Sequence, residues 1–294
     1  MPSTTYTQMA QIILDTINTL FSQLFSSIDQ QMYVILDKLA FITPDILTNS
    51  SIDQINASSV LQIFLTLANS LLVGFSLYYA ARLLYSHFSY VELERPYQFV
   101  FKLLIFAVTL QFSYFICEQI LQINFYLSGS VIEMGSSLLH KPISFENFIQ
   151  NLNQLIQIEE NNFSIFSIDG ILKGFISFQL LNLMFSYALR YIMVKVFVFL
   201  TPFAFLCLIN HSTSWFFKIW IRNLLSLLLL QTLISFILIL LFSIDYSSQD
   251  LLSKFMYIGG IYALSRAGNY TKEWLGGIST DISSGFSNIR SLLK

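Results

Sequence analysis

Long apolar runs, separated by short polar or charged segments, dominate the pattern of this chain. The first two runs cover residues 59–81 and a stretch that begins at Tyr97. Three more cover residues 171–189, 223–244 and, more weakly, 251–264. Because a helix needs about 20 apolar residues to cross a bilayer, the pattern predicts an all-α, polytopic membrane protein with about five transmembrane helices.

A further apolar stretch is bordered by two pairs of basic residues: Arg190 and Lys195 before it, Lys218 and Arg222 after it. Basic residues beside membrane segments collect on the cytoplasmic side. The stretch is too short for an ordinary crossing, and Pro202 removes a backbone donor near its middle. We therefore predict that residues 196–210 form a re-entrant or broken segment. If they cross fully, the chain has six spans and the downstream orientation inverts.

Amphipathic segments flank and interrupt the apolar runs. One of them has apolar residues at helical spacing: Phe145, Phe148, Ile149, Leu152, Leu155 and Ile156. Similar spacing occurs near the amino terminus and in the tail. The predicted regions are an extracytoplasmic amphipathic helix region (1–58), two membrane helices (59–139), an extracytoplasmic amphipathic segment (140–170), membrane helices with the re-entrant segment (171–265) and a cytoplasmic amphipathic tail (266–294).

Composition agrees with a membrane protein, and the distribution of basic residues predicts its orientation. Hydrophobic residues make up 55% of the chain and charged residues 11%, against about 25% charged residues in soluble domains. Eleven of the 15 Lys and Arg residues fall on one side of the five-span topology and four on the other. By the positive-inside rule, we predict an amino terminus outside and a carboxyl terminus in the cytoplasm.

Residue types that carry catalysis or bind metals do not form a recognisable motif. The sequence has no Walker A loop, no G-x-S-x-G and no H-E-x-x-H, and its three histidines are far apart. Cys117 and Cys207 lie in apolar runs and are expected to be free and buried. We predict a protein that is not an enzyme and has no catalytic, cofactor-binding or metal-binding residues.

Glu118 is the one carboxylate with apolar helix on both sides. Ionisable residues within membrane helices often serve function, and Lys173 is a possible partner in a proton-coupled transporter. Alternatively, Glu118 marks the outer end of its helix. Arg190 and Lys195 have two interpretations as well: they line a polar path or hold anionic lipid headgroups, or they snorkel to the membrane surface.

Amides and glycines within the apolar runs suit contacts between helices. Four amides are candidates for interhelical hydrogen bonds: Gln111, Gln179, Asn182 and Gln231. Two glycine pairs allow either a close helix approach or a helix break: Gly259 with Gly260, and Gly276 with Gly277. The candidate channel-lining or assembly residues are Arg190, Lys195, Pro202, Lys218, Arg222, Glu118, Gly276 and Gly277.

The carboxyl-terminal part resembles a known family. The runs LTPFAFLCLINHSTSWFFKIWIRNLLSLLLLQ and YALSRAGNYTKEWLGGISTDISSGFSNI resemble the TrbL-type conjugal transfer proteins, the polytopic inner-membrane channel subunits of bacterial type IV secretion systems. The likeness includes Pro202, the Ser212–Trp215 turn, Lys218 and the Gly276–Gly277 pair. In the first half it is limited to topology.

The resemblance implies a non-enzymatic subunit with an outside amino terminus and about five spans. It also implies self-association in the membrane, contact with the secretion ATPase and other secretion subunits, and transient contact with a DNA–protein substrate. Membrane lipids are a further expected partner. The alternative is a secondary transporter or another small-solute channel. Many transporters have paired broken helices in two repeated halves, whereas only one broken segment is evident here, around Pro202.

Overall fold

The computed structural model describes residues 12, 15–16, 18–20, 23, 35–47, 57–89, 96–155, 168–209, 213–244 and 251–276. All regular structure in these residues is helical, which confirms the all-α prediction. Residues 35–40 are helical, and the elements that follow are η1 (Pro44–Leu47), α2 (Ala57–Ser89), α3 (Pro96–Gln111), α4 (Ser113–Leu139), α5 (Phe145–Leu155), α6 (Ile168–Phe199), α7 (Thr201–Leu206), α8 (Ser214–Phe242) and α9 (Leu251–Leu275). Most of the predicted amino-terminal helix lies outside the described residues.

Three of the described helices are long and apolar enough to cross a membrane, namely α2, α6 and α8. Together α3 and α4 make a fourth candidate if the pair, bent by 51°, is a single broken span. These helices indicate a membrane protein. The number of five crossings stays a prediction.

The bend between α3 and α4 has a local cause at Phe112 and Ser113. The Ser113 hydroxyl is fully buried and donates a hydrogen bond to the Leu110 carbonyl at 2.7 Å. Such back-bonding by serine often bends helices. The backbone N–H of Phe112 still bonds to the Val108 carbonyl at 3.2 Å, and the Phe112 carbonyl accepts from the N–H of Ile116 at 3.0 Å. Phe112 therefore keeps both of its backbone hydrogen bonds at the bend.

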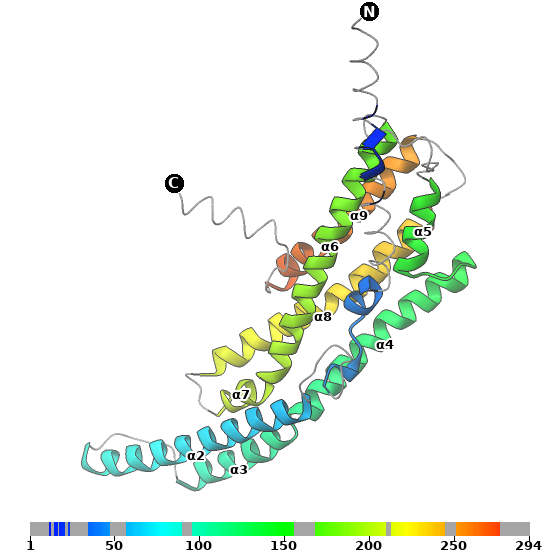
Figure 1. The fold of residues 1–294 in the computed structure, drawn as a ribbon. Coiled ribbons are helices and arrows are strands. Elements are labelled where there is room, and N and C mark those ends of the chain that lie inside the picture. The colour runs from blue at the N-terminus through cyan, green and yellow to red at the C-terminus, as the bar shows by residue number, and fades with distance from the viewer. Residues whose placement is uncertain are drawn as a thin grey trace, which may run out of the picture.

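Helix α8 is the centre of the bundle. In the apolar stretch of α8 that is long enough to cross a membrane, 61% of the residues are buried inside the protein, against 33% for α6 and 11% for α2. It packs along α9 and α4 over much of its length and also contacts α5, α6 and α7. Figure 1 shows α8 running between α4 on one side and α6 and α9 on the other. Helices α4 and α9 are therefore positioned largely by their contacts with α8.

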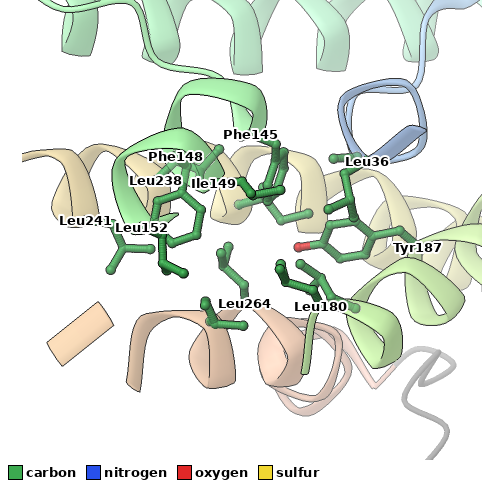
Figure 2. Close-up of a cluster of buried hydrophobic side chains, with 14 of the residues drawn as sticks. Leu36, Phe145, Phe148, Ile149, Leu152, Leu180, Tyr187, Leu238, Leu241 and Leu264 are labelled. Atoms are coloured by element: carbon green, nitrogen blue, oxygen red, sulfur yellow. The ribbon is translucent and has the colours of Figure 1, made fainter. Parts of the chain in front are cut away.

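An apolar cluster joins α5 and the amino-terminal residues to this bundle (Figure 2). On α5 the inward residues Phe145, Phe148, Ile149 and Leu152 are at most 1% exposed, which confirms the apolar face predicted at these four positions. Ile156, predicted on the same face, lies outside the described residues. They meet Leu36 from the amino-terminal part, together with residues of α6, α8 and α9. Two segments that the sequence treated as separate, 1–58 and 140–170, thus meet in one core.

A carboxylate from the amino-terminal part holds the start of α5. The backbone N–H of Phe145 donates to Asp37 Oδ1 at 3.0 Å. The N–H of Asn147 donates to Ser144 Oγ at 3.1 Å. Side-chain acceptors of this kind satisfy the free N–H groups at a helix start, so Asp37 caps a helix more than 100 positions further along the chain.

The segment around Pro202 is a short helix between two long ones. Helix α6 runs unbroken through Arg190 and Lys195 to Phe199. Helix α7 then begins at Thr201, and Pro202 occupies its first turn, where a missing N–H costs nothing. Its residues are mostly buried, and it packs against α2, α3 and α4. The predicted break at Pro202 is present, and a re-entrant path for residues 196–210 stays a prediction.

Helices α2 and α3 lie side by side and extend away from the bundle (Figure 1). They contact the rest of the chain through a small cluster of Ala68, Leu72, Leu110 and Leu206 and through the Phe64 ring, which packs against Phe199 and Phe203. Nearer the hairpin end, the rings of Tyr79 and Phe99 stack with centroids 3.5 Å apart. Large apolar side chains are exposed along both helices, including Leu67, Leu71, Leu77, Val100, Phe101 and Leu104. These faces suit contact with lipid or another membrane helix.

Of the two alternatives for the Gly259–Gly260 pair, a close helix approach or a break, the structure has a close approach at Gly260. A Cβ at this position would overlap the side chain of Leu241 in α8, three atoms of which would lie within 3.0 Å. A Cβ on the neighbouring Gly259 would meet nothing within 4 Å. The two adjacent glycines therefore have different roles, because only Gly260 lets α8 and α9 approach.

We expect Gly260→Ala to lower the stability of the protein by about 1–3 kcal/mol, since the added methyl group overpacks the α8–α9 contact. Gly259→Ala is the matched control and should raise stability by up to about 1 kcal/mol through helix propensity. Thermal unfolding of both variants in the same detergent measures the difference. Equal changes in stability for the two variants would contradict a close contact between α8 and α9 at Gly260.

Candidate functional site

A buried arginine lies at the centre of the bundle. Arg190 is on α6 and is 0% exposed. Its Nε donates to the Leu227 carbonyl of α8 at 2.9 Å, and Nη1 donates to the Ala40 carbonyl at 2.8 Å. Nη2 lies 3.4 Å from Gln231 Oε1. The guanidinium therefore links α6, α8 and the amino-terminal segment 35–47.

Gln231 of α8 is the second member of this network and is also 0% exposed. Its Oε1 accepts hydrogen bonds from the Ile42 backbone N–H at 3.2 Å and from Asn124 Nδ2 at 3.4 Å. Its Nε2 donates to Ser128 Oγ at 2.8 Å, and the hydroxyl of Ser235 lies 3.4 Å from the Ser128 carbonyl. We call Arg190, Gln231, Asn124, Ser128 and Ser235 the central polar network.

The charge of Arg190 is balanced by carbonyl dipoles. In the described part of the chain, no carboxylate forms an ion pair with it. Ala40 is the last residue of the helical stretch 35–40, and carbonyls at a helix end lack intrahelical partners and carry partial negative charge. A buried charge costs several kcal/mol unless it is well hydrogen-bonded. The end of the 35–40 helix therefore helps to make Arg190 tolerable inside α6.

Neither sequence interpretation of Arg190 anticipated this arrangement. It does not snorkel, because its guanidinium is within the bundle and bonded to the backbone. Lys195 lies one to two turns further along α6, is half-buried, and has its Nζ 6.0 Å from the centroid of the Phe199 ring. The two cations on α6 thus have different environments.

The structure brings together two other candidate residues, Arg222 and Gly276. Gly276 ends α9 with φ +67° and donates its N–H to the Lys272 carbonyl. A Cβ on Gly276 would lie 3.3 Å from Arg222 Nη1. This is a helix break of the kind expected for the glycine pair. Gly277 lies outside the described residues.

The remaining candidates lie apart from the central polar network. Pro202 is buried in α7, and Lys218 is exposed on α8. Glu118 is half-buried near the start of α4 and accepts a hydrogen bond from Gln122 Nε2 at 3.3 Å. Lys173 is near the start of α6, at the end of that helix away from α7, whereas the start of α4 packs near α7. Glu118 and Lys173 are therefore not brought together.

Sequence reasoning missed several members of the network. Gln231 was anticipated as an interhelical amide, and its hydrogen bonds confirm that interpretation. Asn124 and Ser128 were not singled out, although their four-residue spacing places them on one face of α4. The Ala40 carbonyl gives no sequence signal, because every residue has one.

No family model, curated protein or solved structure matches the chain. Chemically, the central polar network holds one positive charge and exchanges hydrogen bonds among four segments. In the described residues, no three His, Cys, Asp or Glu side chains are grouped as metal ligands would be.

We expect Gln231→Leu to destabilise the protein by about 2–4 kcal/mol. The change leaves Arg190 Nη2, the Ile42 N–H and Asn124 without their shared acceptor in a buried site. Gln231→Glu keeps an acceptor and adds a counter-charge for Arg190, so this variant should lose clearly less stability. Chemical unfolding in mild detergent compares the two. If both variants lose the same amount of stability, the acceptor role assigned to Gln231 is wrong.

Asp37 predicts a dependence of stability on pH. Burial raises the pKa of its carboxyl, although the N–H groups of Phe145 and Glu146 lower it in part. Because the folded state then binds the proton more tightly than the unfolded state, this contribution favours folding below the ordinary carboxyl pKa. It is lost as pH rises through the folded pKa.

The substitution Asp37→Asn should remove this pH dependence and keep the acceptor for the Phe145 N–H. Asp37→Ala should also remove it, but with a further loss of about 1 kcal/mol at every pH because α5 loses its cap. Unfolding measured from pH 3 to pH 8 tests both expectations. If the wild-type protein and Asp37→Asn show the same dependence of stability on pH, the effect assigned to the Asp37 carboxyl is wrong.

Proposed function

We propose that this protein is a membrane subunit of a bacterial type IV secretion machine that helps to form or assemble the route for DNA–protein substrates. Its role is structural and not enzymatic. The observation that carries the proposal is the resemblance of residues 200–231 to the TrbL-type proteins, combined with their place in the fold. These residues include α7 and the part of α8 that carries the buried Trp220, Leu227 and Gln231, so the resemblance includes part of the centre of the bundle.

The proposed orientation has the amino terminus outside, the carboxyl terminus in the cytoplasm and five crossings of the inner membrane. The sorting of charges along antiparallel α8 and α9 supports it. Arg222 lies beside Gly276, so Lys218 and Lys272 belong to the same end of the pair. Lys254 lies in the first turn of α9, at the other end. In this topology α7 occupies the re-entrant segment 196–210.

The proposed partners are further copies of the chain, the secretion ATPase, other membrane subunits and lipids, with the substrate as a transient contact. The uneven burial of the spans supports an assembling subunit. Helix α8 is well packed, whereas α2 leaves most of its surface to other molecules. A protein with one well-packed bundle and one largely uncovered hairpin suits a membrane assembly.

Deleting the gene in a donor cell that encodes it should abolish DNA transfer, and a plasmid copy should restore it. Nicking at the transfer origin should continue, because the protein acts in transport and not in DNA processing. The tagged protein should also co-purify with the secretion ATPase. Unchanged transfer frequency, or restored uptake of a small solute as the sole effect of the plasmid copy, would refute the proposal.

A further inference from the structure

Helix α2 carries a line of mostly polar side chains along a face that the bundle does not cover. Gln62, Thr66, Asn69, Val73 and Ser76 follow one another at spacings of four and three residues, which places them on one side of the helix. We call these five residues the α2 stripe. Three of them are exposed, and Asn69 and Ser76 are half-buried.

Helix α3 adds an amide beside the α2 stripe. Nε2 of the exposed Gln111 lies 3.3 Å from Asn69 Oδ1, so the two amides are hydrogen-bonded. Asn69 is ten residues from the start of the span at Ser59, which corresponds to a depth of about 15 Å at 1.5 Å per residue. In the proposed topology the amide pair is therefore near the middle of the hydrocarbon layer.

The two amides retain hydrogen-bonding groups that their mutual bond does not use. A primary amide has two donor hydrogens and one acceptor oxygen with two lone pairs, whereas the bond between Gln111 and Asn69 uses one donor and one lone pair. The hydroxyls of Thr66 and Ser76 bond to carbonyls of their own helix, at 2.8 and 3.0 Å. Asn69 and Gln111 thus have hydrogen-bonding groups that a lipid tail leaves unsatisfied.

We propose that the α2 stripe, with Gln111, binds a second copy of this chain within the membrane. The face has no charged side chain among the five residues or at Gln111, so a partner recognised by charge does not fit it. A second copy presents amides that both donate and accept at the same depth. Interhelical amide bonds of this kind promote association of membrane helices.

The opposite face of α2 is apolar and serves as a control surface for the α2 stripe. Leu67, Leu71 and Tyr78 are about half or more exposed and lie on the side of the helix away from the α2 stripe. These side chains suit contact with lipid, because lipid tails are as apolar as leucine. The inference rests on the proposed membrane assembly and specifies which surface the copies share.

Photo-crosslinking of the purified full-length protein tests this surface. Two differently tagged versions, each with a benzophenone amino acid at one position, are reconstituted together in lipid vesicles without other proteins. Thr66 and Val73 test the α2 stripe, and Leu67 and Leu71 are controls at matched depth. We expect products that carry both tags at the stripe positions, at least tenfold more abundant than at the controls. Equal yields, or lipid adducts alone at the stripe, would overturn the inference.

Amide substitutions give a second, independent measurement. Asn69→Leu combined with Gln111→Leu should weaken association about tenfold, as measured by energy transfer between labelled copies in vesicles. Gln98→Leu removes an exposed amide elsewhere on α3 and should leave association unchanged. An unchanged affinity in the double variant would refute the role of the amides.

These measurements separate the inference from the proposed function. Both use vesicles that contain no secretion components, so association through the α2 stripe can hold even if DNA transfer does not depend on the protein. Conversely, a transfer defect without stripe-specific crosslinking would support the proposed function and reject this surface. A crosslink to a different protein at Thr66 in cells, with none between copies, would also reject it.

Discussion

The guanidinium of Arg190 imposes the main constraint on this fold. A positive charge inside an apolar bundle is tolerated only when its donors are satisfied, and here the acceptors come from α8 and from the segment 35–47. Gln231 extends the same network to α4. Four parts of the chain must therefore be in place together, which makes the centre of the bundle cooperative.

Burial divides the membrane part into two regions with different needs. The region around α8 buries most of its apolar side chains internally, with α5 and Leu36 covering one side of the core. The buried hydroxyls of Ser226 and Thr232 on α8 have no hydrogen-bond partner among the described residues, in contrast to Gln231. The hairpin of α2 and α3 has few internal contacts and depends on its surroundings. This division explains how one chain can combine a stable interior with a surface suited to assembly in a membrane.

The sequence predicted the elements better than it predicted their contacts. Helical spacing at Phe145, Phe148 and Ile149 was sufficient for α5, and Pro202 correctly indicated a break. Arg190 was placed at a membrane border because basic residues usually lie there. Its true partners are backbone carbonyls 37 and 150 positions away. Local patterns report which face of a helix is apolar, but no local pattern reports a distant carbonyl.

The long reach of the central polar network has a consequence for biosynthesis. The N–H of Ile42 bonds to a side chain 189 positions later, and at about 5–20 residues per second the ribosome needs roughly 10–40 s to make that interval. During this time the early segment has no Gln231 to bind. Its docking must therefore follow insertion of α8, and a translational pause before α8 would prolong the exposure of its apolar residues to chaperones and proteases.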